Sequence, residues 1–190
     1  MARPLDENRR ASLLTAATRV FAEHGVSAPT SLVSKQAKIS EGSLFTYFKT
    51  KDELIAAVYV QIRQEAAVAI MTNFPVKAGI RERLEHVYRQ FVTWGAENRI
   101  SRRALAQVQL SKAVTPQLRA KTQLLYSEVD RIQEDALAQK RLHVPAVMPG
   151  PVIAALGDMT MALIEQNPSQ AEELLDAGFQ MLWAALSSKP

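Results

Sequence analysis

The fold of this chain is decided by residues 30–51, which read TSLVSKQAKISEGSLFTYFKTK. The segment predicts two short helices joined by a tight turn, because Thr30 and Ser40 are residue types that cap helix N-termini. Leu44 and Phe48 lie four residues apart, so they fall on one helical face and are expected to point inward. Two short helices in this order predict a helix-turn-helix.

The polar residues of this segment predict two kinds of contact with DNA. A helix in the major groove needs small or polar side chains on its outer face, so that base edges can approach closely. The residues that meet this requirement are Ser40, Glu41, Gly42, Ser43 and Thr46. A second group has hydroxyls, amides or cations suited to phosphates, which position a protein without reading sequence. This group is Thr30, Ser31, Tyr47, Lys49 and Lys51.

Glu41 is the acidic residue in the predicted groove-facing set. A carboxylate can accept a hydrogen bond from the amino group of cytosine, but near phosphates it is otherwise unfavourable.

Composition is that of a globular protein, with 190 residues, 47% apolar and 22% charged, which argues against disorder. The formal net charge is +4, and residues 1–63 hold nine Lys/Arg against six Asp/Glu. A basic N-terminal third fits a nucleic-acid binder. Without cysteine there is no disulfide or thiolate metal site. We find no long apolar run and no apolar signal-peptide core, so we expect a cytoplasmic protein that does not enter a membrane.

Helical periodicity runs through the chain, and no alternating strand pattern stands out, so we expect an all-α fold. Breaks at residues 73–79 and 142–151 interrupt the pattern. The predicted helices cover residues 6–24, 31–37, 40–47, 52–72, 80–98, 101–110, 116–140, 151–166 and 170–187. We expect two domains, a three-helix DNA-binding domain at residues 1–51 and a helical domain at residues 52–190.

The N-terminal segment resembles the TetR (tetracycline-repressor-like) family of transcriptional regulators from about Arg10 to Leu54. The shared pattern includes AATRVFAEHG at residues 16–25, SEGSLFTYF at residues 40–48 and KDEL at residues 51–54. The resemblance implies DNA contacts at Thr30, Ser40, Gly42, Tyr47 and Lys51. Two positions depart from the pattern. Lys38 stands where glycine is usual and must adopt a backbone conformation that favours glycine. Phe45, in the recognition helix, replaces a common tyrosine.

The resemblance also implies that the C-terminal domain binds a small molecule and pairs two subunits through its last two helices. These helices are apolar on more than one face, which independently favours a partner. Candidate dimer contacts are Leu156, Thr160, Leu163, Leu175, Phe179, Leu182 and Trp183. Candidate ligand contacts mix aromatic and polar groups, and they are Met71, Phe74, Phe91, Trp94, Leu105, Gln109, Tyr126 and Met159.

The sequence therefore predicts a homodimeric regulator of an operator in double-stranded DNA. We expect a repressor that an unidentified small-molecule effector releases. The alternative is a helical DNA-binding or interaction module without an effector site. An enzyme is disfavoured, because we find no nucleophile or phosphate-loop motif. No cofactor is expected, and His86 and His143 lack neighbours at metal-ligand spacing.

Overall fold

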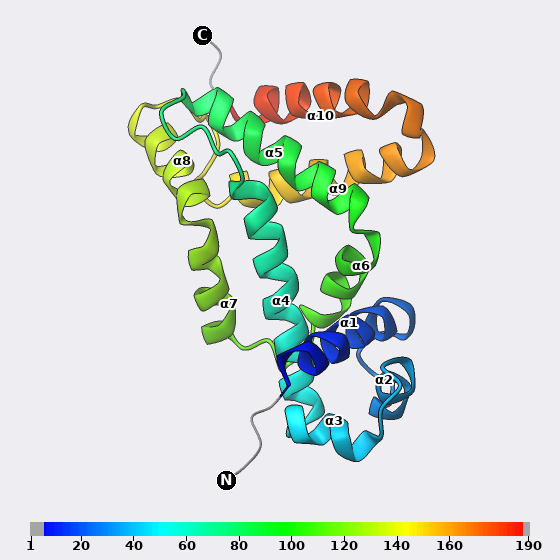
Figure 1. Cartoon of the computed structure of the whole chain (residues 1–190). Helices are drawn as coiled ribbons and strands as arrows, with labels where there is room; N and C mark the ends of the chain where they lie inside the picture. Colours follow the sequence, from blue (N-terminus) through cyan, green and yellow to red (C-terminus); the bar gives the residue numbers. More distant parts are fainter. Residues whose placement is uncertain (1–5, 188–190) are drawn as a thin grey trace. The chain divides into compact units, whose positions relative to one another are not determined.

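The computed structural model describes residues 6–187, which form helices, connecting turns and one isolated β-bridge between Leu142 and Ser187. The predicted all-α fold is confirmed for this range (Figure 1). The chain divides into two compact units. Unit 1 combines the residues up to 65 with residues 98–125, and unit 2 combines residues 66–97 with those from 126 onward. The expected boundary at residue 51 differs from this division, because residues 98–125 group with the N-terminal helices.

Unit 1 is built on helix α1 (Glu7–His24), which packs against α2 (Thr30–Gln36) and α6 (Arg99–Val108). The carboxylate of Asp6 caps α1 by accepting the amide N–H of Asn8 at 3.0 Å. Gly25 ends the helix with φ +72° and ψ 177°, a backbone region that is essentially restricted to glycine. The other helices of unit 1 are α2 (Thr30–Gln36), α3 (Glu41–Tyr47), the first part of α4 (Lys51–Met71), α6 (Arg99–Val108) and α7 (Pro116–Gln123).

The core of unit 1 follows the predicted helical spacing. On α1 and α4, apolar side chains that recur at helical spacing are buried. They are Leu13, Ala17, Val20, Phe21, Leu54, Val58 and Ile62. By length and composition alone α4 could cross a membrane. However, 44% of its most apolar stretch is buried inside the fold, as in the core helix of a globular protein.

Unit 2 contains the end of α4 and α5 (Ile80–Glu97), α8 (Ser127–Ala138), α9 (Pro149–Gln166) and α10 (Ala171–Leu186). Helices α5, α9 and α10 pack against one another (Figure 1). The prediction of one helix over residues 116–140 is wrong, because a 3₁₀ turn, Leu124–Tyr126, separates α7 from α8. Thr122 is buried in unit 1, whereas Tyr126 is buried in the core of unit 2. The break between α7 and α8 contains no proline or glycine, and we attribute it to the burial of Thr122 and Tyr126 in two different units.

A polar contact is buried at the centre of unit 2. The hydroxyl groups of Tyr88 and Thr160 are hydrogen-bonded at 2.7 Å, and the Tyr88 hydroxyl also donates to the Leu156 carbonyl at 3.3 Å. A Cβ atom at Gly178 would lie 2.4 Å from the Tyr88 hydroxyl and 2.5 Å from the Thr160 hydroxyl. Only glycine therefore lets α10 approach this pair. Burial raises the pKa of Tyr88, and the hydrogen bond with Thr160 partly opposes that rise.

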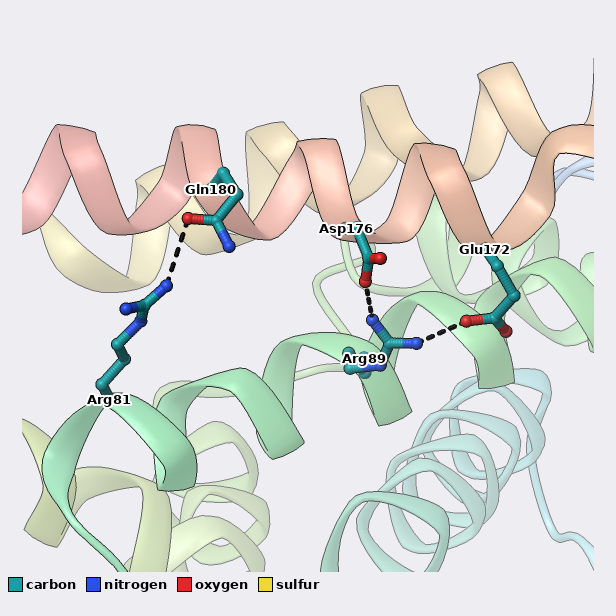
Figure 2. A network of polar contacts seen from close by, with 5 residues as sticks. All are labelled: Arg81, Arg89, Glu172, Asp176 and Gln180. Carbon is teal, nitrogen blue, oxygen red and sulfur yellow. Dashed lines mark hydrogen bonds and ion pairs between the residues drawn. The ribbon is translucent and has the colours of Figure 1, made fainter.

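Charged side chains join α5 to α10 at the surface of unit 2 (Figure 2). The guanidinium of Arg89 lies between Glu172, at 2.5 Å, and Asp176, and it donates to both carboxylates. About two helical turns before Arg89 on α5, Arg81 donates to the Gln180 side chain at 3.2 Å. These contacts hold one face of α10 against α5 within unit 2.

Candidate nucleic-acid interface

Helix α3 has a buried side and an exposed side, as the sequence predicts. Leu44 is 0% exposed and Phe48 only 1%. Gly42 and Thr46, on the opposite side, are exposed. Glu41, Phe45 and the capping Ser40 are exposed as well, while Ser43 and Tyr47 are half-buried. A Cβ atom at Gly42 would meet no atom within 4 Å, so the surface at this point is open.

The turn between α2 and α3 is closed by backbone hydrogen bonds. The amide of Ile39 donates to the Ser34 carbonyl at 3.0 Å, and the amide of Lys38 donates to the Lys35 carbonyl at 3.1 Å. This pair of bonds forms a Schellman motif, whose left-handed residue is usually glycine. Lys38 occupies that position with φ +56°, which confirms the left-handed conformation predicted for it.

The hydroxyl groups of α3 are bonded within the helix. The Ser40 side chain accepts the Ser43 amide at 3.2 Å, which confirms Ser40 as the N-cap, and it also contacts the Ser43 hydroxyl at 2.8 Å. The Thr46 hydroxyl donates to the Gly42 carbonyl at 3.2 Å. A hydroxyl oxygen keeps acceptor capacity beside the hydrogen that it donates. The exposed face therefore combines small size with groups that can still bond to a ligand.

Thr30 does not cap α2, contrary to the sequence prediction. Pro29, in an extended conformation, occupies the N-cap position, and Thr30 is the first residue of the helix. The Thr30 hydroxyl instead donates to the Glu41 carboxylate at 2.5 Å. This contact joins the first residue of α2 to the first residue of α3, and local sequence patterns of either helix give no sign of it.

The predicted phosphate-contacting residues lie in the segments that flank α3. Ser31, on α2, and Lys49, after α3, are exposed, while Lys51 at the start of α4 is half-buried. The link from α3 to α4 is fixed by two bonds that sequence reasoning missed. Thr50 accepts the Glu53 amide at 3.0 Å, and the Glu53 carboxylate accepts the Lys49 amide at 2.7 Å. The signal was present in Thr50-Lys-Asp-Glu53, because a threonine followed three residues later by glutamate is a capping pattern.

The eight predicted ligand contacts are divided between the units. Leu105 and Gln109 belong to unit 1, and the other six belong to unit 2. In unit 2, Trp94 and Tyr126 are buried, Met71, Phe74 and Phe91 are half-buried, and Met159 is 39% exposed. The Phe91 ring fills the space above Gly157, where an added Cβ would lie 2.5 Å from a ring carbon. It therefore serves in the packing of α5 on α9.

The predicted dimer contacts also differ in exposure. Thr160, Leu175, Phe179 and Leu182 are each 5% exposed or less within the single chain. They belong to the core of unit 2, because this face of the two helices packs on α5. Leu156, Leu163 and Trp183 are half-buried. Among the large apolar side chains of α9 and α10, Met159 and Met181 are exposed, the latter by 46%.

A cavity of about 630 Å³ in unit 1 lies between α1 and α4. Its lining includes Arg10, Phe48 and Gln61, and none of the predicted ligand contacts. The guanidinium of Arg10 lies over the Phe48 ring at 5.3 Å. Because Phe48 caps the C-terminus of α3, the cavity adjoins that end of the helix.

Comparisons with known sequences agree with this description of unit 1. Residues 13–58 match the sequence profile of a family described as bacterial regulatory proteins, tetR family. A Bacillus subtilis protein described as an uncharacterized HTH-type transcriptional regulator, YhgD, is 30% identical over 82 residues. That match covers 40% of this chain and 43% of the relative, so the chain aligns with less than half of the relative's length.

Solved structures resemble the chain over nearly its whole length. A protein from Shewanella sp. PV-4, described as a tetR family transcription regulator, matches with a TM-score of 0.84 at 17% identity, covering 95% of this chain and 99% of the other. A TetR family regulator from Marinobacter aquaeolei VT8 matches with a TM-score of 0.84 at 19% identity, covering 97% and 98%. LfrR from Mycobacterium smegmatis, solved with proflavine, matches with a TM-score of 0.68 at 17% identity, covering 97% and 100%.

These similarities confirm the resemblance on which the sequence interpretation rests. The matched proteins are described as transcription regulators and not as enzymes. At these identities the solved structures establish the fold, and the profile match establishes the type of the N-terminal segment.

Proposed function

We propose that this chain, whose N-terminal segment is a DNA-binding domain of the tetR family, is a dimeric transcriptional repressor released by a small molecule. In this proposal α3 enters the major groove, and residues of α2 and the start of α4 contact phosphates. Two copies of α3, about 34 Å or a multiple of that distance apart, would read two half-sites of one operator.

The observation that carries the DNA-binding part is the outer face of α3. Its exposed residues include the small Gly42 and the hydroxyl-bearing Ser40 and Thr46, and the helix is held to the core of unit 1 by the buried Leu44 and Phe48. At Gly42 nothing lies within 4 Å of an added Cβ, so the backbone of α3 is open to close approach by a base edge. The left-handed turn at Lys38 sets the direction in which α3 leaves α2.

Replacing Gly42 with tryptophan tests this assignment. The indole would point into open space, so we expect a folded protein that has lost groove entry. Affinity for a selected operator duplex should fall by on the order of 10³-fold, the lower end of the usual gap between specific and non-specific binding. Gly150, whose Cβ position is equally open on α9, gives the matched control Gly150→Trp. Equal affinities in the two folded variants would contradict the role of α3.

The dimer part of the proposal is supported by the exposed apolar side chains of the last two helices. Met159 and Met181 are 39% and 46% exposed, although their helices already bury another face inside unit 2. Apolar side chains exposed on neighbouring helices favour a partner surface. In this proposal the half-buried Leu163, one helical turn after Met159, extends this face, and Trp183 remains a predicted contact beside it.

Met181→Glu tests the dimer, because a carboxylate on that face cannot be buried without a large desolvation cost. We expect a folded monomer in sedimentation and a loss of operator affinity, since each half-site would then be bound alone. Val147→Glu is the control, because Val147 is 78% exposed in the loop before α9. A Met181→Glu variant that remains dimeric at micromolar concentration would exclude this face as the interface.

The effector part is supported by the aromatic residues of unit 2 and by the proflavine complex of the structural relative LfrR. Phe74, Trp94 and Tyr126 are of the type that lines pockets for flat apolar molecules. An effector can release DNA only if it binds the released conformation more tightly than the DNA-bound one.

Titration with proflavine and a panel of metabolites tests the effector. Tryptophan fluorescence reports binding, because the chain has two tryptophans, and Trp94→Phe and Trp183→Phe assign the signal. We expect a bound compound to weaken operator binding. If the operator complex is insensitive to the whole panel, the DNA-binding module without an effector site becomes the better description.

A further inference from the structure

We propose that the hydrogen bond between Thr30 and Glu41 must break when the protein binds DNA, and that Glu41 thereby makes affinity depend on the base that faces it. The inference rests on the proposed DNA-binding function and adds a specificity-determining residue to it. Its basis is the contact between the Thr30 hydroxyl and the Glu41 carboxylate oxygen at 2.5 Å.

The first step concerns the single proton of the Thr30 hydroxyl. A threonine hydroxyl donates one hydrogen bond, and in the free protein that bond goes to Glu41. A DNA phosphate offers only acceptors, so the hydroxyl can bind a phosphate only after it leaves the carboxylate. The two contacts are therefore mutually exclusive for this proton.

The second step concerns the carboxylate that is left behind. Glu41 is exposed at the first position of α3, and the N-terminal residues of a recognition helix are the ones that contact base edges. Once Thr30 turns to a phosphate, the Glu41 carboxylate loses its donor and lies among negative charges. The amino group of a cytosine or an adenine in the major groove replaces the lost donor, whereas guanine O6/N7 and thymine O4 present only acceptors. The free-energy cost of breaking the Thr30–Glu41 bond is therefore offset on DNA sequences that place an amino group opposite Glu41, and it is not offset on the others.

The neighbouring polar groups of α3 do not offer the same compensation. The hydroxyls of Ser40 and Ser43 contact each other, and that of Thr46 donates to the Gly42 carbonyl. The exposed cations nearest in sequence, Lys38 and Lys49, lie on the turns that precede and follow α3. Glu41 is the acidic residue of α3, so its carboxylate repels the DNA phosphates. The affinity of the complex therefore depends on which donor the carboxylate finds there.

The experiment is a double-mutant cycle with Thr30→Val and Glu41→Ala, measured with and without DNA. The two DNA probes are a duplex of about 30 base pairs, selected by the wild-type protein from a random pool, and a scrambled duplex of the same composition. On the scrambled duplex, Glu41→Ala should raise affinity by about tenfold when Thr30 is present, because both the repulsion and the competing acceptor are removed. In the Thr30→Val background only the repulsion is removed, and the gain should fall to about threefold.

Discrimination between the two duplexes is the second readout. Glu41→Ala should lower the ratio of selected to scrambled affinity by about fivefold or more, the value of one base-edge contact. Glu134→Ala, on the exposed side of α8 in unit 2, changes the net charge equally and should leave the ratio unchanged. Thr30→Ala and Glu41→Met, which also lack the hydroxyl and the carboxylate, repeat the cycle in case the first variants are less stable.

Thermal unfolding of the four DNA-free proteins completes the cycle. If the hydrogen bond is present in solution, the two substitutions should be non-additive by about 1–2 °C in Tm. Equal gains in both backgrounds, or additive Tm changes, would overturn the inference even if the wild type binds DNA normally. A wild type that selects no duplex would instead refute the proposed function, while the thermal cycle would still test the contact itself.

Discussion

The hydroxyl groups of the helix-turn-helix and those at the centre of unit 2 are arranged in opposite ways. In the helix-turn-helix of unit 1, the hydroxyls of Ser40, Ser43 and Thr46 lie at the surface and bond within their own helix. In unit 2, the hydroxyls of Tyr88 and Thr160 are buried and bond between different helices. The first arrangement can exchange its partners for a ligand, whereas the second has no solvent access and fixes the packing of α5 on α9.

The difference teaches where each unit tolerates change. A buried polar group without its partner costs much more than an exposed one, which water can satisfy. We therefore expect substitutions in the polar centre of unit 2 to affect folding, and those on α3 to affect DNA binding with little loss of stability.

The largest effect is expected from Gly178→Ala. The added Cβ would lie within 2.5 Å of both buried hydroxyl oxygens, so α10 must move away from the pair. We expect a loss of about 3 kcal/mol or more in the free energy of unfolding, measured in urea. The matched substitution Gly42→Ala, in open space on α3, should leave stability unchanged or raise it by up to about 1 kcal/mol. Comparable losses in both variants would remove the contrast between the units.

The next effect concerns the hydroxyl pair itself. Tyr88→Phe should cost about 1–3 kcal/mol, because it leaves the Thr160 hydroxyl buried without its partner. Thr160→Val should cost less, because the Tyr88 hydroxyl keeps its bond to the Leu156 carbonyl. The double variant should lose less than the sum of the two, since no orphaned partner remains. Additive losses would show that the hydrogen bond contributes little. Hydrogen exchange should place the loss in residues 66–97 and 126–187.

The same pair predicts a pH dependence. Burial raises the pKa of Tyr88 above its unfolded value, so the neutral phenol is the form that the folded state favours. Its contribution is complete below the unfolded pKa of about 10 and is lost as the pH rises through the folded pKa. Urea titrations between about pH 9 and pH 11.5 should show a steeper fall for the wild type than for Tyr88→Phe. Parallel curves would contradict the assignment.

A smaller effect, of opposite sign, is expected in the turn before α3. Lys38→Gly should stabilise the protein by up to about 1 kcal/mol, because glycine adopts φ +56° without a Cβ penalty. Lys35→Gly, in the last turn of α2, should destabilise by about 1 kcal/mol. Thermal unfolding of the two variants checks the sign. The same sign in both would mean that backbone conformation does not decide the effect.

The smallest effect is expected at the surface contacts of unit 2 (Figure 2). Arg89→Gln removes the ion pairs with Glu172 and Asp176, whose side chains are 80% and 67% exposed. We expect a loss of less than about 1 kcal/mol that shrinks in about 1 M salt. Arg131→Gln, which removes an ion pair within α8, is the control and should cost less still. A larger, salt-independent loss would mean that Arg89 acts through packing.

The sequence by itself determined the features of unit 1 that depend on neighbouring residues. Ser40 as a cap, Lys38 in the left-handed region and the inward position of Leu44 and Phe48 all follow from local spacing, and the structure confirms each of them. Caps, turns and helical faces are set within a few residues, so one segment of sequence contains the information.

Only the tertiary structure decided the contacts between distant elements. It assigned the Thr30 hydroxyl to Glu41, broke the expected long helix at residues 124–126, and buried Thr160 and Phe179 inside unit 2. A helix that is apolar on two faces does not reveal which face meets its own chain and which remains exposed. That choice depends on packing against α5, which the spacing along α9 and α10 does not specify.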